Sequence, residues 1–211
     1  DPDDGHVPAL TAEGQQRRAR ARQTIYAGGS DSWEDRSLYD RCITRGFPAS
    51  GMPTIYGNSS RIVQGPGYIA IQYKMIHETR LVPIDKEPRA HLPAKHRLDM
   101  GDSRGHWDGD TLVVETTNFN TRSIYQNANP DTLTITERFT RVDADTIGYA
   151  ATVDDPKTFT RPFTLQFPWR RDGSYGIYEY ACHEGNHSLF NILSGARADD
   201  RESAATGAVR P

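Results

Sequence analysis

The chain has 211 residues, with 25 Lys and Arg against 28 Asp and Glu and a formal net charge of −3. This length predicts one domain with a sizeable core, because two full domains usually need more residues. The charge balance lacks the basic excess that nucleic-acid binding requires, and no run approaches the roughly 20 apolar residues of a membrane span. We therefore expect neither a nucleic-acid partner nor a membrane span.

Residues 1–60 are predicted to form an arm, short helices and a loop that pack on the body. An extended Pro-containing start precedes a polar helix over residues 11–24 and a Gly-Gly turn. Ser32 is a good N-cap followed by acidic residues, which predicts a short helix in "SWEDRSLYDRCI". The stretch "RGFPASGMPTIYGNSS" is too rich in Gly, Pro and Ser for regular structure, so a surface loop is expected there.

From Arg61 the apolar residues alternate with a period of two, which is typical of β-strands. We expect strands in "RIVQG", in one long stretch that starts near residue 68, and in "DTLVVETTNF", "TLTITERFTRV", "TIGYAATV", "FTRPFTLQFPW" and "YGIYEYACH". Short turns join most of them, which favours an antiparallel meander that protects its edges by closing into a barrel or a sandwich. Residues 61–195 are thus predicted to be a mainly β domain. It ends in a short helix capped by Asn186 and stopped by Gly195, and a polar tail over residues 196–211 follows.

Several strands place one ionisable residue among their inward-facing apolar residues. Counting by twos from the clear apolar positions gives this set: His77, Glu115, Glu137, Arg161 and Glu179. The face of Glu115 is ambiguous, since its strand is apolar on both sides. Charges inside a barrel must pair or face a wet cavity. One interpretation is a polar pocket in which His77 or Glu137 acts as a base and Arg161 stabilises negative charge. The alternative is a structural ion-pair network.

The stretch "HLPAKHRLDMGDSRGHWDGD" interrupts the strand pattern and is expected to be a long loop over one end of the domain. Its Asp102, Arg104 and Trp107 are candidate binding residues at the rim of the pocket, together with His183 and Glu184 at a strand end. The histidines of this loop lie five and ten residues apart, which fits no compact metal motif. "HEGNH" matches the zinc motif H-E-x-x-H only formally, because a strand is expected to run into it where the motif needs a helix. No metal site and no cofactor are predicted.

Cys42 and Cys182 lie in no C-x-x-C pair, which leaves either a disulfide or two free thiols. The chain resembles a family of uncharacterised exported proteins of Gram-negative soil and aquatic bacteria. The resemblance covers roughly residues 1–199 and is carried by "EDRSLYDRCI", "GDSRGHWDGDTLVVETTNF", "ERFTRVDADTIGYAATVDDPKTFTRP" and "YEYACHEGN". It implies a periplasmic or extracellular location, which favours the Cys42–Cys182 disulfide, and a leader and a further segment before Asp1. It implies no activity.

Taken together, these patterns predict an exported protein that binds or transforms a small organic molecule or sugar in an internal polar pocket by acid-base chemistry. Whether it is an enzyme stays open. The alternative is a structural module without catalysis, in which residues 1–10 add a strand to a neighbouring copy and form a homo-oligomer or filament.

Overall fold

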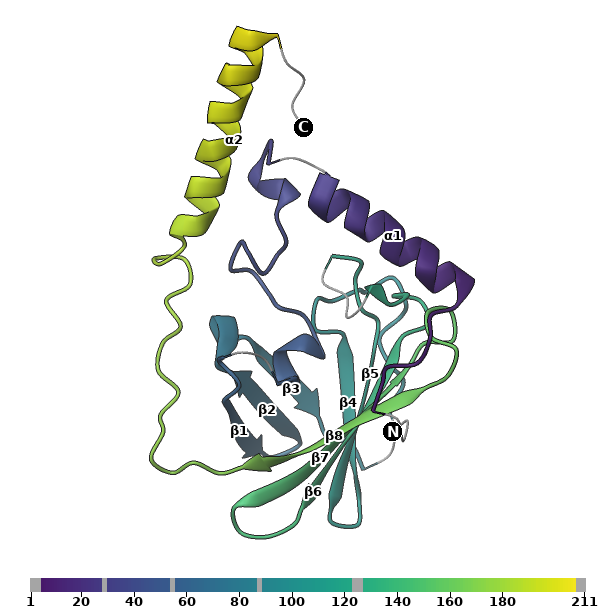
Figure 1. Cartoon of the computed structure of the whole chain (residues 1–211). Helices are drawn as coiled ribbons and strands as arrows, with labels where there is room; N and C mark the ends of the chain where they lie inside the picture. The colour runs from purple at the N-terminus through teal and green to yellow at the C-terminus, as the bar shows by residue number, and fades with distance from the viewer. Residues whose placement is uncertain (1–4, 28–29, 54–55, 87–88, 123–126, 208–211) are drawn as a thin grey trace.

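The computed structural model describes residues 5–27, 30–53, 56–86, 89–122 and 127–207. Within these residues the strands form two antiparallel meanders (Figure 1). The first contains three strands, β1 (Ser60–Gly65), β2 (Tyr68–Tyr73) and β3 (Thr79–Pro83). The second contains five, β4 (Asp102–Asp108), β5 (Thr111–Thr117), β6 (Thr134–Arg141), β7 (Thr146–Asp154) and β8 (Phe163–Arg170). The prediction of a mainly β antiparallel meander is confirmed.

The two sheets are joined on one side only. Ile84, just after β3, forms a parallel bridge with Gly105 of β4, and the Asp85 N–H donates to the Gly105 carbonyl at 3.0 Å. No ladder joins β1 to β8 in the described part of the chain. A closed barrel is therefore not found, and the edges of β1 and β8 border an open seam.

The facing sheets enclose the core. One cluster of buried side chains lies between the sheets: Ile69, Ile71, Tyr73, Val82, Leu112, Val114, Phe139, Tyr149 and Ala151. A second lies towards α1: Phe47, Phe119, Ala128, Leu133, Ile135, Val153, Phe159 and Phe163. Along β2, β6 and β7 the buried residues follow the predicted period of two, since alternate side chains point to the same face, whereas β5 buries Leu112, Val113 and Val114 in succession.

The helix α1 (Ala12–Ala27) agrees with the predicted N-terminal helix. Thr11 caps it by accepting a hydrogen bond from the Gly14 N–H at 3.0 Å. Gly14 lies so close to the backbone that a Cβ atom there would stand 2.4 Å from the Thr158 carbonyl oxygen. Residues 9–11 pair with residues 158–160 of the same chain, so this part of the arm is engaged within its own molecule.

The helix α2 (His187–Thr206) extends away from the sheets (Figure 1). Asn186 caps it as predicted, accepting from the Leu189 N–H at 3.2 Å. The predicted stop at Gly195 is wrong, because the helix runs on to Thr206 and ends at Gly207. An interior Gly costs a helix only about 1 kcal/mol, and the Ala, Arg and Glu residues that follow are good helix formers.

Four other expectations are corrected. Instead of one strand running to His77, β2 ends at Tyr73 and a 3₁₀ turn (Met75–His77) reverses the chain into β3. Ile76 and His77 have positive φ there, which no strand allows. Residues 102–108, expected in a loop, form β4. Residues 175–183, expected to be a strand, have no ladder. After Ser32 only a single 3₁₀ turn forms, closed by a capping box with Asp35.

Candidate functional site

Glu137 faces the interior, as its position among apolar residues predicted. Its carboxylate is paired with Arg80 of β3, whose Nη1 and Nη2 donate to the two carboxylate oxygens at 2.6 and 3.0 Å. The side chains of Arg80 and Glu137 are only 2% and 1% exposed. Tyr149 also donates to Glu137 at 2.9 Å, and the Arg80 guanidinium lies 4.0 Å from the Phe47 ring centroid. This geometry is that of a structural ion pair within the core.

The pKa values of Arg80 and of the tyrosines around this pair are shifted. Burial raises the pKa of Tyr73 and the pKa of Tyr149, and the Glu137 carboxylate adds to both shifts. Burial alone would lower the pKa of Arg80, but the adjacent Glu137 outweighs it and raises that pKa. The Arg80 charge is therefore fixed, and Glu137 has no open side from which it could act as a base.

The other four proposed catalytic residues do not converge with Glu137. Arg161 is exposed and precedes β8, so the expectation that it faces the interior is wrong; residues 159–161 are not in a strand, and counting by twos fails there. Glu179 is exposed on the segment without a ladder. His77 turns away from the core, with Nε2 2.9 Å from the Tyr178 carbonyl oxygen and 3.0 Å from the Tyr180 backbone nitrogen.

The remaining one, Glu115, lies on the outer face of the five-stranded sheet. His91 bridges it to Asp102, with Nε2 3.0 Å from Glu115 and Nδ1 2.9 Å from Asp102. Asp102 also accepts from the Leu92 N–H at 2.9 Å and lies 3.3 Å from Arg104. These contacts hold the chain at residues 91–92 against the sheet. The expectation that Asp102 and Arg104 border an internal pocket is wrong, because their strand turns them outward.

A pocket of about 450 Å³ opens at one end of the space between the sheets. Its floor is formed by core residues of both sheets: Ile69, Ile71, Leu112, Phe139 and Ile147. Trp107, predicted at a rim, does line it and is 48% exposed. Trp169 also lines it, and its ring is fixed by stacking on Tyr149 at 4.9 Å and by an edge contact with Phe139 at 5.6 Å.

Charged side chains of both signs surround the mouth of this pocket. They come from the β4–β5 turn, the β6–β7 turn and the end of β8: Asp110, Arg141, Asp143, Asp145, Arg170 and Arg171. Arg141 donates a hydrogen bond to the Asp143 carbonyl at 3.1 Å, and the Arg171 N–H donates to the Asp145 carbonyl at 2.7 Å. These bonds connect residues of the rim to one another. Arg donates only and a carboxylate accepts only, so the rim offers both kinds of hydrogen-bond partner.

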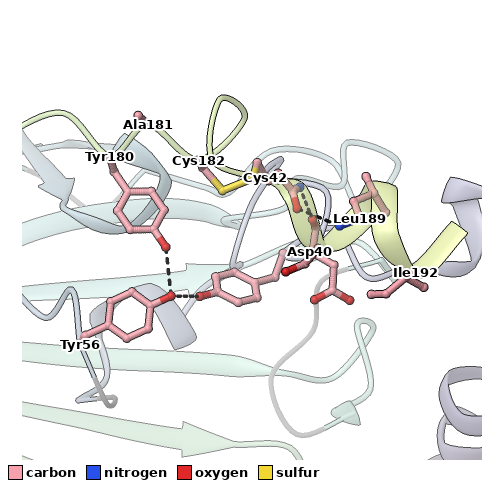
Figure 2. A pocket seen from close by; sticks show the side chains of 12 residues that line it. Asp40, Cys42, Tyr56, Tyr180, Ala181, Cys182, Leu189 and Ile192 are labelled. Atoms are coloured by element: carbon pink, nitrogen blue, oxygen red, sulfur yellow. Dashed lines mark hydrogen bonds between the residues drawn. A yellow bond between two sulfur atoms is a disulfide. The ribbon is translucent and has the colours of Figure 1, made fainter. Parts of the chain in front are cut away.

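A second pocket, of about 320 Å³, lies beside the Cys42–Cys182 disulfide (Figure 2). Three tyrosines meet in it, with the Tyr56 hydroxyl 3.2 Å from that of Tyr39 and 3.1 Å from that of Tyr180. The disulfide, which the resemblance favoured, is thus confirmed and joins the segments that carry Tyr39 and Tyr180. Sequence reasoning missed these tyrosines, because they stand outside the regular elements.

His183 and Glu184, proposed at the mouth of a pocket, are exposed in the turn just before α2. The H-E-x-x-H match has no helix across it, since α2 begins only at His187. Among the described residues no group of three or more His, Cys, Asp and Glu side chains is placed to hold a metal ion. In the same residues no helix is long and apolar enough to cross a bilayer.

Comparisons of the chain with protein-family models, with curated proteins and with solved structures found no match. The function is therefore argued from the geometry of these sites.

Proposed function

We propose that the pocket between the two sheets binds a sugar or a similar small polyhydroxylated molecule. The observation that carries this proposal is the pairing of two tryptophan rings with a rim of mixed charge. Trp107 and Trp169 line the same pocket from β4 and β8, the two edge strands of the five-stranded sheet. A sugar has apolar C–H faces that pack on aromatic rings, and its hydroxyls need donors and acceptors at the edge.

The size and lining of the pocket support the same ligand class. A volume of about 450 Å³ lies within the range of roughly 300–1,000 Å³ that is typical of small-molecule sites. The apolar floor favours burial of one ligand face, and the rim supplies three Arg and three Asp side chains, whose formal charges cancel. A balanced rim favours a neutral ligand with many hydroxyls over a strongly charged one.

Binding without chemistry is the form of the proposal that the geometry supports. The five residues considered for acid-base chemistry lie in different places, namely the core, the outer face of the sheet and the surface segments. Of the arm over residues 1–10 that the assembly hypothesis uses, Ala9 and Leu10 pair with residues 159–160 of their own chain. The disulfide supports the further proposal that the protein is exported, since disulfides persist in oxidising compartments.

The test is a titration of the protein with neutral mono- and disaccharides and with uronic acids, followed by calorimetry and tryptophan fluorescence. We expect saturable binding of at least one neutral sugar. Trp107→Ala should weaken it by about tenfold or more, since about 1.4 kcal/mol of lost contact corresponds to that factor.

Trp33→Ala is the matched control, because Trp33 is 50% exposed and lies outside the pocket lining. This variant should bind the sugar with the same affinity as the unaltered chain. The absence of binding to every sugar tested, or an equal loss in both variants, would overturn the proposal.

A further inference from the structure

The tyrosine pocket beside the disulfide is independent of the pocket between the sheets. Tyr39 comes from the N-terminal part of the chain, Tyr56 from the loop before β1, and Tyr180 from the segment after β8. Figure 2 shows the hydroxyls of Tyr180 and Tyr56 pointing toward one another across the space between these segments. The chain thus brings together three phenol oxygens from positions up to 141 residues apart (180 − 39).

The disulfide accounts for this convergence. Cys42 lies three residues after Tyr39, and Cys182 lies two residues after Tyr180. Asn186 adds to the same junction by donating to the Asp40 carbonyl at 2.7 Å. Because Tyr39 and Tyr180 are each adjacent to a half of the bridge, their hydroxyls are held at a set separation around Tyr56.

The pKa of Tyr56 is shifted in the opposite direction to the pKa values of Tyr39 and Tyr180. The hydroxyls of Tyr180 and Tyr39 both act on Tyr56 and lower its pKa, and the charge of Arg45 acts in the same direction. Burial raises the pKa of Tyr39 and that of Tyr180, and their bonds to Tyr56 add to this. The three hydroxyls are therefore coupled to one another through the bonds to Tyr56.

We propose that Tyr39, Tyr56 and Tyr180 form a binding site for a hard, highly charged cation, and that ferric iron is its ligand. Phenolate oxygen is a hard ligand, and tyrosinate is a known protein ligand of iron. The residues are not the sulfur and imidazole donors that zinc and copper sites favour.

The geometry of the oxygens fits one shared ion. Bonds from small cations such as Zn²⁺ and Mg²⁺ to protein oxygens are about 2.0–2.2 Å long. For an ion at that distance from two oxygens 3.1 or 3.2 Å apart, the oxygen–ion–oxygen angle is about 90–105°. This angle suits adjacent positions around an octahedral ion. Each phenol loses its proton to solvent as its oxygen binds, so full ligation releases three protons and leaves three phenolates around the trivalent ion.

The pocket leaves room for the rest of the coordination shell. Tyr56 is 50% exposed, so the ion would be reached from solvent and would keep water or a small anion on its open side. The wall formed by Ala181, Leu189 and Ile192 is apolar, which lowers the local dielectric and strengthens the attraction between phenolate and cation.

The experiment is a titration of the full disulfide-bonded chain with ferric nitrilotriacetate at neutral pH, followed by visible absorption. We expect a phenolate-to-iron charge-transfer band that saturates at one ion per chain, and resonance Raman bands of coordinated tyrosinate. Single Tyr→Phe variants at positions 39, 56 and 180 should weaken binding by more than about tenfold, since even outer-shell partners cost 10–100-fold.

Tyr178→Phe is the matched control, because Tyr178 lies on the same segment as Tyr180, is 67% exposed and is not part of the cluster. The Cys42→Ser, Cys182→Ser double variant should lose the band, since it frees Tyr180 from Tyr39. Far-UV circular dichroism shows whether each variant is folded, and the Raman spectrum of the unaltered chain tests the ligands without any variant. The absence of a band, or a band that survives in the Tyr56→Phe variant, would overturn the proposal.

Discussion

The buried pair of Arg80 and Glu137 gives the sharpest test of how the two sheets are held together. Arg80 stands on β3 and Glu137 on β6, so their two hydrogen bonds link the three-stranded sheet to the five-stranded one. We consider two single variants, Glu137→Leu and Arg80→Met, and the variant that carries both changes.

The magnitude follows from the burial of both groups. Removal of Glu137 leaves the Arg80 guanidinium 2% exposed without its counter-charge and leaves the Tyr149 hydroxyl without its acceptor. Breaking one partner of a buried pair typically costs 3–5 kcal/mol. The double variant replaces both charges with apolar groups of similar length, and such replacements are often neutral or stabilising. We therefore expect each single variant to be less stable by about 3–5 kcal/mol and the double variant to recover most of that loss.

The assay is thermal and urea unfolding of the four proteins, followed by circular dichroism and analysed as a double-mutant cycle. For a chain of this size, 1 kcal/mol corresponds to roughly 2–4 °C in Tm, so each single change should lower Tm by about 6–20 °C. Additive losses in the double variant would refute the reasoning, because they would show that the two side chains act separately.

Three further predictions concern the periphery. Gly14→Ala should destabilise the protein, because its Cβ would lie 2.4 Å from a backbone oxygen, whereas Gly195→Ala in open space should raise the helical signal at 222 nm by stabilising α2. In a phenolate-absorbance titration one tyrosine should ionise below the usual range, since the folded-state pKa of Tyr56 is lowered, and Tyr56→Phe should remove that step. The double serine variant of the disulfide should lose hydrogen-exchange protection in residues 175–186 while β5–β7 keep theirs, because the latter are held by ladders.

The sequence pattern predicted the strands whose apolar residues alternate with polar ones and missed β4, whose residues do not. In β6 and β7 apolar residues alternate with polar ones, so the period of two was visible. In β4 the outer face carries Asp102, Arg104 and His106, and the inner face carries small residues at positions 103 and 105. Such a strand has no apolar alternation, and only its pairing with β5 reveals it.

The same difference explains which site residues were found. Glu137 was visible as a charge among apolar residues of one strand. Its partner Arg80 was not, because residues 79–83 were not expected as a separate strand, and the apolar neighbour Leu81 is 58% exposed. Trp107 was identified as a large aromatic next to a turn, but its pocket needs the ends of several strands and two turns, which only the topology brings together.

The segment after β8 shows how a fold can place a residue without secondary structure. Residues 171–186 form no ladder, yet Lys74 lies 4.7 Å from the Tyr175 ring centroid and donates a hydrogen bond to its hydroxyl, His77 contacts the backbone at Tyr178 and Tyr180, and Cys182 is bonded to Cys42. Each of these contacts involves a different residue of the segment, so its path is determined by side chains and by one covalent bond. These long-range contacts together position Tyr180 beside Tyr56. The local sequence pattern of residues 171–186 does not predict any of these contacts.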